Sequence, residues 1–107
     1  MATKKKPRSI ADLLSGRFLS GILIEGSELS LRFRDARIKI DLNERSWRFG
    51  ANPGYWLTFP GLLRVVRVIE DRTQIILVVS GALYTSEIAV RQKKGGWQLV
   101  FDANFVA

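Results

Sequence analysis

The clearest pattern in the chain is the alternation of apolar and polar side chains in ELSLRFRDARIKIDL, residues 28–42. In a β-strand, a period of two places the apolar side chains on one face and the polar side chains on the other. The alternation breaks at Asp35 and Ala36, where the chain has to reverse. The stretch therefore predicts a β-hairpin with one buried face.

The register of this hairpin follows from keeping charged side chains out of the apolar face. A turn of two or four residues keeps both apolar sets together, whereas a three-residue turn would carry charges among them. We therefore expect three cross-strand apolar pairs: Phe33 with Ile38, Leu31 with Ile40, and Leu29 with Leu42.

Apolar segments separated by short turn sequences, such as EGSE at 25–28 and KKGG at 93–96, follow one another from residue 17 onward. Connections this short favour antiparallel neighbours. About seven to nine strands in a meander predict a mainly β fold, either a small antiparallel barrel or a two-sheet sandwich. The turn positions also predict four further pairs: Ile24 with Leu29, Ile22 with Leu31, Val90 with Leu99, and Ile88 with Phe101.

The segment LLRVVRVI, residues 62–69, departs from simple alternation because Arg64 and Arg67 are three positions apart. A regular strand would point these two side chains to opposite faces of the sheet. The spacing predicts either a β-bulge near Val65 and Val66 or a short strand that begins late.

A short helix is predicted over SIADLLSG, residues 9–16. Ser9 can cap the free N–H groups together with Asp12, and Gly16 can adopt the left-handed conformation that ends a helix. Two turns of helix are not stable alone, so the apolar side chains of this helix are expected to lie on the sheet. Residues 1–8 are expected to form a flexible basic arm, and residues 9–107 a single β-rich domain.

The composition excludes several kinds of chemistry, because the chain contains no cysteine and no histidine. Disulfides, thiolate nucleophiles and the most common general base and metal ligand are therefore absent. No phosphate-binding glycine loop and no metal-spaced cluster occurs either. We expect a protein that is not an enzyme and that uses no metal and no cofactor.

No apolar run approaches the roughly 18 residues that a transmembrane helix requires. Lys4, Lys5 and Lys6 are followed by Pro7 rather than by an apolar segment, which is not the pattern of a secretory signal. The expectation is a cytoplasmic protein with no membrane span.

Positive charge is the main indication of a partner, since the net charge is +7 at pH 7. On the polar face of the 28–42 hairpin, the expected register places Arg34 opposite Arg37 and Arg32 opposite Lys39. Each such pair of like charges destabilises a hairpin by about a few tenths of a kcal/mol. A bound polyanion would offset this cost, and so would a carboxylate on a neighbouring strand, Glu25 or Glu28 being the nearest in sequence.

A second indication is the aromatic segment GANPGYWLTFPG, residues 50–61. Its prolines cannot donate to a strand ladder, which predicts a strand at the edge of a sheet. Tyr55, Leu57 and Phe59 share one face and are expected in the core, whereas Trp56 and Thr58 lie on the other face. A filled interior is expected from six inward aromatic residues: Trp47, Phe49, Tyr55, Phe59, Trp97 and Phe101.

The leading hypothesis is a binding protein whose basic sheet face contacts a polyanion, most simply nucleic acid, or an acidic protein surface. The residues predicted to make these contacts are Arg32, Arg34, Arg37, Lys39, Arg48, Lys4, Lys5, Lys6 and Arg8. The alternative is a protein-interaction or regulatory module that binds its partner through Trp56 and Thr58, because tryptophan is favoured at the centres of interfaces.

Overall fold

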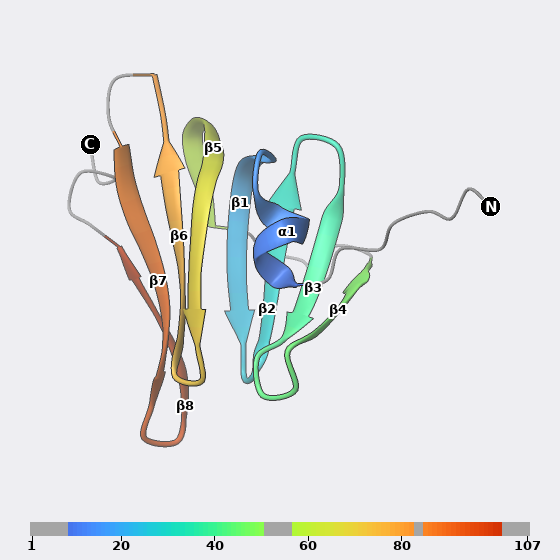
Figure 1. Cartoon of the computed structure of the whole chain (residues 1–107), viewed down its shortest axis with the longest axis vertical. Helices are drawn as coiled ribbons and strands as arrows, with labels where there is room; N and C mark the ends of the chain where they lie inside the picture. Colours follow the sequence, from blue (N-terminus) through green and yellow to red (C-terminus); the bar gives the residue numbers. More distant parts are fainter. Residues whose placement is uncertain (1–8, 51–56, 83–84, 102–107) are drawn as a thin grey trace.

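The computed structural model describes residues 9–50, 57–82 and 85–101, with the backbone alone at Pro60. These residues form one short helix and eight antiparallel strands (Figure 1). The elements are α1 (Ile10–Leu14), β1 (Phe18–Glu25), β2 (Glu28–Phe33), β3 (Arg37–Asp41), β4 (Ser46–Phe49), β5 (Leu57–Asp71), β6 (Gln74–Ser80), β7 (Thr85–Lys93) and β8 (Gly96–Phe101). The predicted mainly β, antiparallel architecture with one helix is confirmed.

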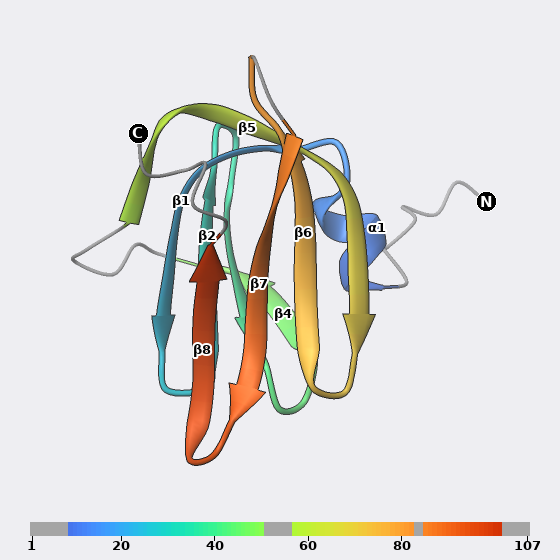
Figure 2. The ribbon, with the colours of Figure 1, turned by 90° about the vertical axis from the view of Figure 1, so that its left-hand side faces the viewer.

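All eight strands belong to one sheet, in the order β4-β3-β2-β1-β5-β6-β7-β8. The sheet is open, because no pairing joins β4 to β8 within the described residues. Strand β5 is long and bends strongly across one end of the molecule (Figure 2). It pairs with β1 from Leu57 to Arg64 and with β6 from Arg64 onward, so it divides the sheet into two parts. Strands β1 and β8, which are not neighbours in the sheet, also come into contact.

The core lies between these two parts and consists almost entirely of aliphatic side chains, with Phe33 as the one fully buried aromatic residue among those described. The prediction of an interior filled by aromatic residues is therefore wrong in detail. Most of the described aromatic residues pack against the rim of the core and are only partly buried, namely Trp47, Phe59, Trp97 and Phe101. Phe49, on the outermost strand β4, is 58% exposed, and Leu57, the first residue of β5, is 46% exposed. Among the described strands, neither residue has a neighbouring strand on both sides, and Tyr55 lies outside the described residues.

Helix α1 begins and ends where the sequence predicts. Ser9 is the N-cap, and its Oγ accepts a hydrogen bond of 3.1 Å from the Asp12 N–H. Gly16 follows the helix with a φ of +85°. The helix packs against β5 and adds Ile10, Leu13 and Leu14 to the core.

The register between β2 and β3 differs from the predicted one by two residues. Leu31 lies opposite Ile38, and Leu29 lies opposite Ile40. A shift by two keeps every side chain on its face, so the alternation alone does not distinguish the two registers. Two backbone hydrogen bonds of 2.8 Å accompany the observed register: the Phe33 N–H bonds to the Ala36 carbonyl within the hairpin, and the Arg34 N–H bonds to the Phe18 carbonyl of β1. Phe33, the last residue of β2, is therefore paired with Leu19 of β1, and four residues, 33–36, separate the last residues that pair β2 with β3, Arg32 and Arg37.

The pairs predicted across the other two hairpins are confirmed: Ile24 with Leu29, Ile22 with Leu31, Val90 with Leu99, and Ile88 with Phe101. The predicted bulge in β5 is confirmed as well, since its register with β6 shifts between Val65 and Arg67. As a result Arg64 lies opposite Ser80 and Arg67 lies opposite Val78, while Val65 and Val79 are buried. Both arginines therefore lie on the outer face of the sheet.

At the end of the molecule opposite the bend in β5, Arg45 joins the two parts of the sheet (Figure 1). From the turn after β3, its guanidinium donates to Glu70 Oε2 at 2.7 Å and to the Asp71 carbonyl at 2.6 Å. It also lies over the Trp97 ring, 5.7 Å from the centroid. Arg45 therefore connects the turn after β3 with the end of β5 and with β8, which are distant from it in sequence.

Asp71 organises the turn between β5 and β6, and this gives a prediction about pH. Its Oδ1 accepts hydrogen bonds from the N–H and the hydroxyl of Thr73, at 2.8 and 2.9 Å, which lower the pKa of Asp71 from the ordinary value of 3.8. A pKa that is lowered on folding stabilises the fold above the unfolded-state pKa, and this stabilisation is lost as the pH falls through the folded-state pKa.

We therefore expect Asp71→Asn to lower the melting temperature at pH 6, and the difference from the parent protein to shrink as the pH falls below about 4. Thermal unfolding followed by circular dichroism between pH 6 and pH 2.5 measures both melting temperatures. A difference that stays constant over this range would contradict a role for the Asp71 carboxylate charge.

Candidate polyanion-binding surface

The structure places most of the predicted basic face on the outer side of strands β2, β3 and β4. Arg32 lies opposite Arg37, and Lys39 lies opposite Arg48. Like charges therefore do face each other across the strands, although in different pairs from those expected. The arm residues Lys4, Lys5, Lys6 and Arg8 lie outside the described residues.

Two of the predicted cations are balanced by a carboxylate of their own chain. Glu28, on β2, accepts a hydrogen bond of 2.7 Å from Arg48 and lies 3.9 Å from the Lys39 ammonium group. The expectation that Glu28 offsets charge on a neighbouring strand is thus confirmed for this pair. Lys39 and Arg48 together contribute only one unit of uncompensated charge.

Arg34 does not belong to the strand ladder, and its predicted position opposite Arg37 is wrong. It lies in the turn between β2 and β3, where its guanidinium covers the Phe18 ring at 4.7 Å from the centroid. The Arg34 side chain is exposed, and Phe18 is half-buried. The turn therefore presents an ordered, exposed guanidinium at the start of β1.

Arg32 and Arg37 differ in how firmly their side chains are held. Arg32 Nε donates to the Ser20 hydroxyl at 3.1 Å, and this hydroxyl donates in turn to the Arg32 carbonyl at 3.0 Å. Arg37 is exposed, and within the described residues its side chain makes no hydrogen bond or ion pair. The pair thus combines, on the same face, one guanidinium oriented by Ser20 and one with no hydrogen-bond or ion-pair partner among the described residues.

Arg64 and Arg67 extend this surface beyond β1, and sequence reasoning did not assign them to it. Phe18 lies directly opposite Arg64, so the ring has Arg34 on one side and Arg64 on the other. Two strand spacings separate these arginines, or about 10 Å. The spacing of three between these arginines indicated the bulge in β5. It did not indicate which strands lie next to β5 in the sheet. We call Arg34, Arg37, Arg64 and Arg67 the arginine surface.

The turn between β2 and β3 and the bend of β5 lie at the same end of the molecule (Figure 1). Arg34 lies in this turn and Arg37 directly after it, whereas Arg64 and Arg67 belong to β5. All four side chains are exposed, and none makes an ion pair within the part of the chain that the structure describes. Arg17 and Arg45, by contrast, are paired with Asp35 and Glu70. A free guanidinium offers a planar fork of donors that fits phosphate or carboxylate oxygens.

The predicted second site is only partly described, because Trp56 lies outside the described residues and its role stays a prediction. Thr58 is exposed and lies opposite Gly21 of β1. Leu57, Thr58 and Leu63 pair with β1, and residues 57–63 do not pair with β6, so within the described residues this part of β5 has one unpaired side. That is consistent with the predicted edge.

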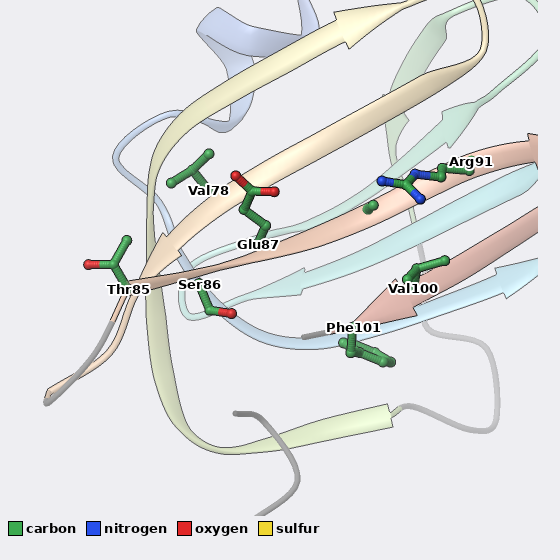
Figure 3. Close-up of a pocket in the computed structure, with 8 residues that line it drawn as sticks. Val78, Thr85, Ser86, Glu87, Arg91, Val100 and Phe101 are labelled. Atoms are coloured by element: carbon green, nitrogen blue, oxygen red, sulfur yellow. The ribbon is translucent and has the colours of Figure 1, made fainter. Parts of the chain in front are cut away.

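The outer face of β6, β7 and β8 carries a shallow groove of about 400 Å³ (Figure 3). Its apolar floor includes Val78 and Val100, and Glu87 and Arg91 bring one charge of each sign. Nearby, the buried Ser86 hydroxyl has no hydrogen-bond partner among the described residues. The groove holds no concentration of positive charge comparable to the arginine surface.

The described residues contain no group of three or more acidic side chains close enough to hold a metal ion. Among them, no helix has the length and apolar character needed to cross a membrane. Comparison of the chain with models of protein families, with curated proteins and with solved structures finds no significant match.

Proposed function

We propose that this protein is a nucleic-acid-binding protein without enzymatic activity, which contacts phosphates through the arginine surface. The observation that carries the proposal is that four exposed arginines on the outer side of the sheet make no ion pair with any described carboxylate. Two of them, Arg34 and Arg64, are both neighbours of Phe18. Packing like charges together costs stability. The carboxylate in the adjacent turn, Asp35, is paired with Arg17 rather than with any of these four arginines.

The chemistry of the surface suits a phosphate backbone. Arginine donates two parallel hydrogen bonds to a phosphate, and each neutralised phosphate releases a condensed counterion, which makes binding favourable at low salt. Arg32, oriented by Ser20 and lying opposite Arg37, adds a further cation next to the arginine surface. The basic arm, with Lys4, Lys5, Lys6 and Arg8, would strengthen such binding without adding sequence specificity.

The proposal predicts a steep salt dependence that the arginine surface controls. Affinity for a fluorescently labelled 20-nucleotide DNA single strand, measured by anisotropy, should fall linearly in a plot of log K against log salt. Each arginine that contacts a phosphate contributes about 0.7 to this slope. The double variant Arg64→Ala/Arg67→Ala should therefore lower the slope by about 1.4 and weaken binding at low salt.

Arg72→Ala is the matched control, because Arg72 is exposed in the turn between β5 and β6, at the opposite end of the molecule. It removes the same kind of charge and should change the slope little. An affinity that hardly changes between low and moderate salt would contradict the proposal. So would equal effects of the Arg72 variant and of each single change at Arg64 or Arg67. Binding to an acidic protein but to no oligonucleotide would point to a protein partner instead.

A further inference from the structure

Three arginines of the described chain lie over aromatic rings: Arg17 over Phe33 at 5.8 Å, Arg45 over Trp97 at 5.7 Å, and Arg34 over Phe18 at 4.7 Å. A guanidinium over a ring is attracted to it, and the ring holds the guanidinium plane in one orientation. The three pairs differ in what else the arginine contacts. In two pairs the arginine also donates hydrogen bonds within the fold, and in the third its donors are available to a ligand.

Arg17 and Arg45 are fully engaged within the fold. Arg17 donates to the Leu13 carbonyl at 2.8 Å and to Asp35 at 3.4 Å. Arg45 donates to one carboxylate and two backbone carbonyls. Their donors are used to join elements of the sheet and helix, so neither arginine is available to a ligand.

Arg34 is held without using its side-chain donors. Its backbone N–H bonds to the Phe18 carbonyl, and its guanidinium rests on the ring of the same residue. Within the described residues, the guanidinium has no hydrogen-bond or ion-pair partner, and the side chain is exposed. Phe18 thus holds the guanidinium group by its ring, and the donors of this group remain available.

We propose that Arg34 is a stacking site for an unpaired base, and therefore that the ligand of the arginine surface is single-stranded nucleic acid. This inference rests on the proposed function and adds that the nucleic acid is single-stranded. Bases stack on aromatic rings and on guanidinium planes, which requires a base face that a duplex does not expose. The stack would run from Phe18 through Arg34 to the base, with Arg64 on the other side of Phe18 contacting the flanking phosphate.

The Arg34 side chain already rests on Phe18 in the free protein, and this favours a role in stacking. An exposed arginine side chain loses much conformational freedom when it is fixed by a ligand, and a partner already in place reduces this loss. Arg37, in contrast, has no contact that fixes its side chain within the described residues, so it can contribute charge but no prepared stacking plane.

The test compares three ligands at one salt concentration: a 12-nucleotide DNA single strand, the same strand with abasic sites throughout its centre, and the corresponding duplex. Fluorescence anisotropy gives each affinity. We expect the intact single strand to bind about tenfold more tightly than the abasic strand, as for one stacked base. The duplex should bind no more tightly than the abasic strand.

Two variants locate the effect. Arg34→Lys keeps the charge but removes the plane, and Phe18→Leu keeps an apolar side chain but removes the ring. Each should reduce the affinity for the intact strand about tenfold, to the level of the abasic strand, and leave the salt slope unchanged. Arg37→Lys is the matched control on the same surface and should leave the preference for the intact strand in place.

The outcomes separate the inference from the proposed function. Equal affinity for all three ligands, or an Arg34→Lys variant that keeps the preference, would overturn the stacking site while salt-dependent binding still supported the proposed function. Tighter binding of the duplex would overturn it as well. No binding to any of the three would overturn the proposed function itself. If Phe18→Leu lowers the melting temperature, the result for Arg34→Lys alone tests the stacking site, because the Arg34 side chain is exposed and its replacement should not disturb the fold.

Discussion

Replacing Arg45 with alanine is expected to lower the melting temperature by about 10–20 °C, which corresponds to about 2–3 kcal/mol for a domain of this size. Arg45 donates to the Glu70 carboxylate and to the Asp71 carbonyl, and it covers the Trp97 ring. The side chains of Arg45 and Glu70 are only 20% and 26% exposed, so removing one partner leaves the other charge partly desolvated.

Two further variants distinguish the causes of this loss. Arg45 has a φ of 60°, a conformation in which most side chains are strained, so Arg45→Gly relieves the backbone but removes the same contacts. It should be less destabilised than Arg45→Ala and still clearly less stable than the parent protein. Thermal and urea unfolding measure all three proteins. A loss for Arg45→Ala no larger than for Arg72→Ala would show that the contacts of Arg45 contribute little.

Leu14→Ala is expected to destabilise the fold by about 2–5 kcal/mol, the usual cost of removing a fully buried leucine side chain. Leu14 is completely buried, and the five-residue helix that carries it is too short to be stable without the sheet. The variant should therefore both leave a cavity and loosen the packing of α1 against β5.

Leu62→Ala is the matched control for this change, because Leu62 is 40% exposed on β5. The same substitution there should cost about 1 kcal/mol or less, since part of the side chain is already in water. Urea denaturation gives the free energy of unfolding of both variants. Equal losses would contradict the role of α1 as part of the core.

Much of the fold could be predicted from local patterns. Alternation identified the strands and their buried faces, and short turns of known position determined the pairs of Ile24 with Leu29 and of Val90 with Leu99. The spacing of Arg64 and Arg67 indicated the bulge, because only an extra residue allows both side chains to lie on the outer face.

The features that could not be predicted depend on contacts between distant parts of the chain. The register between β2 and β3 goes together with the hydrogen bond from Arg34 to Phe18, sixteen residues away in sequence. The position of Arg64 across from Phe18 likewise depends on the pairing of β5 with β1, which no local pattern encodes. The basic side chains of β2, β3 and β4 were therefore predicted on the outer face, where the structure places them. The pairing of Lys39 and Arg48 with Glu28 was not counted in the candidate site, and Arg64 and Arg67 were not assigned to it.

The position of β5 between β1 and β6 has a consequence for how the protein is made. On the ribosome, strands β1 to β4 leave the exit tunnel before residues 57–64 do. Until then the free side of β1 presents unsatisfied backbone groups, which can pair with another nascent chain. Early protection against aggregation at this edge therefore depends on the arrival of a single strand, and a pause in translation while β5 is still inside the tunnel would prolong the exposure.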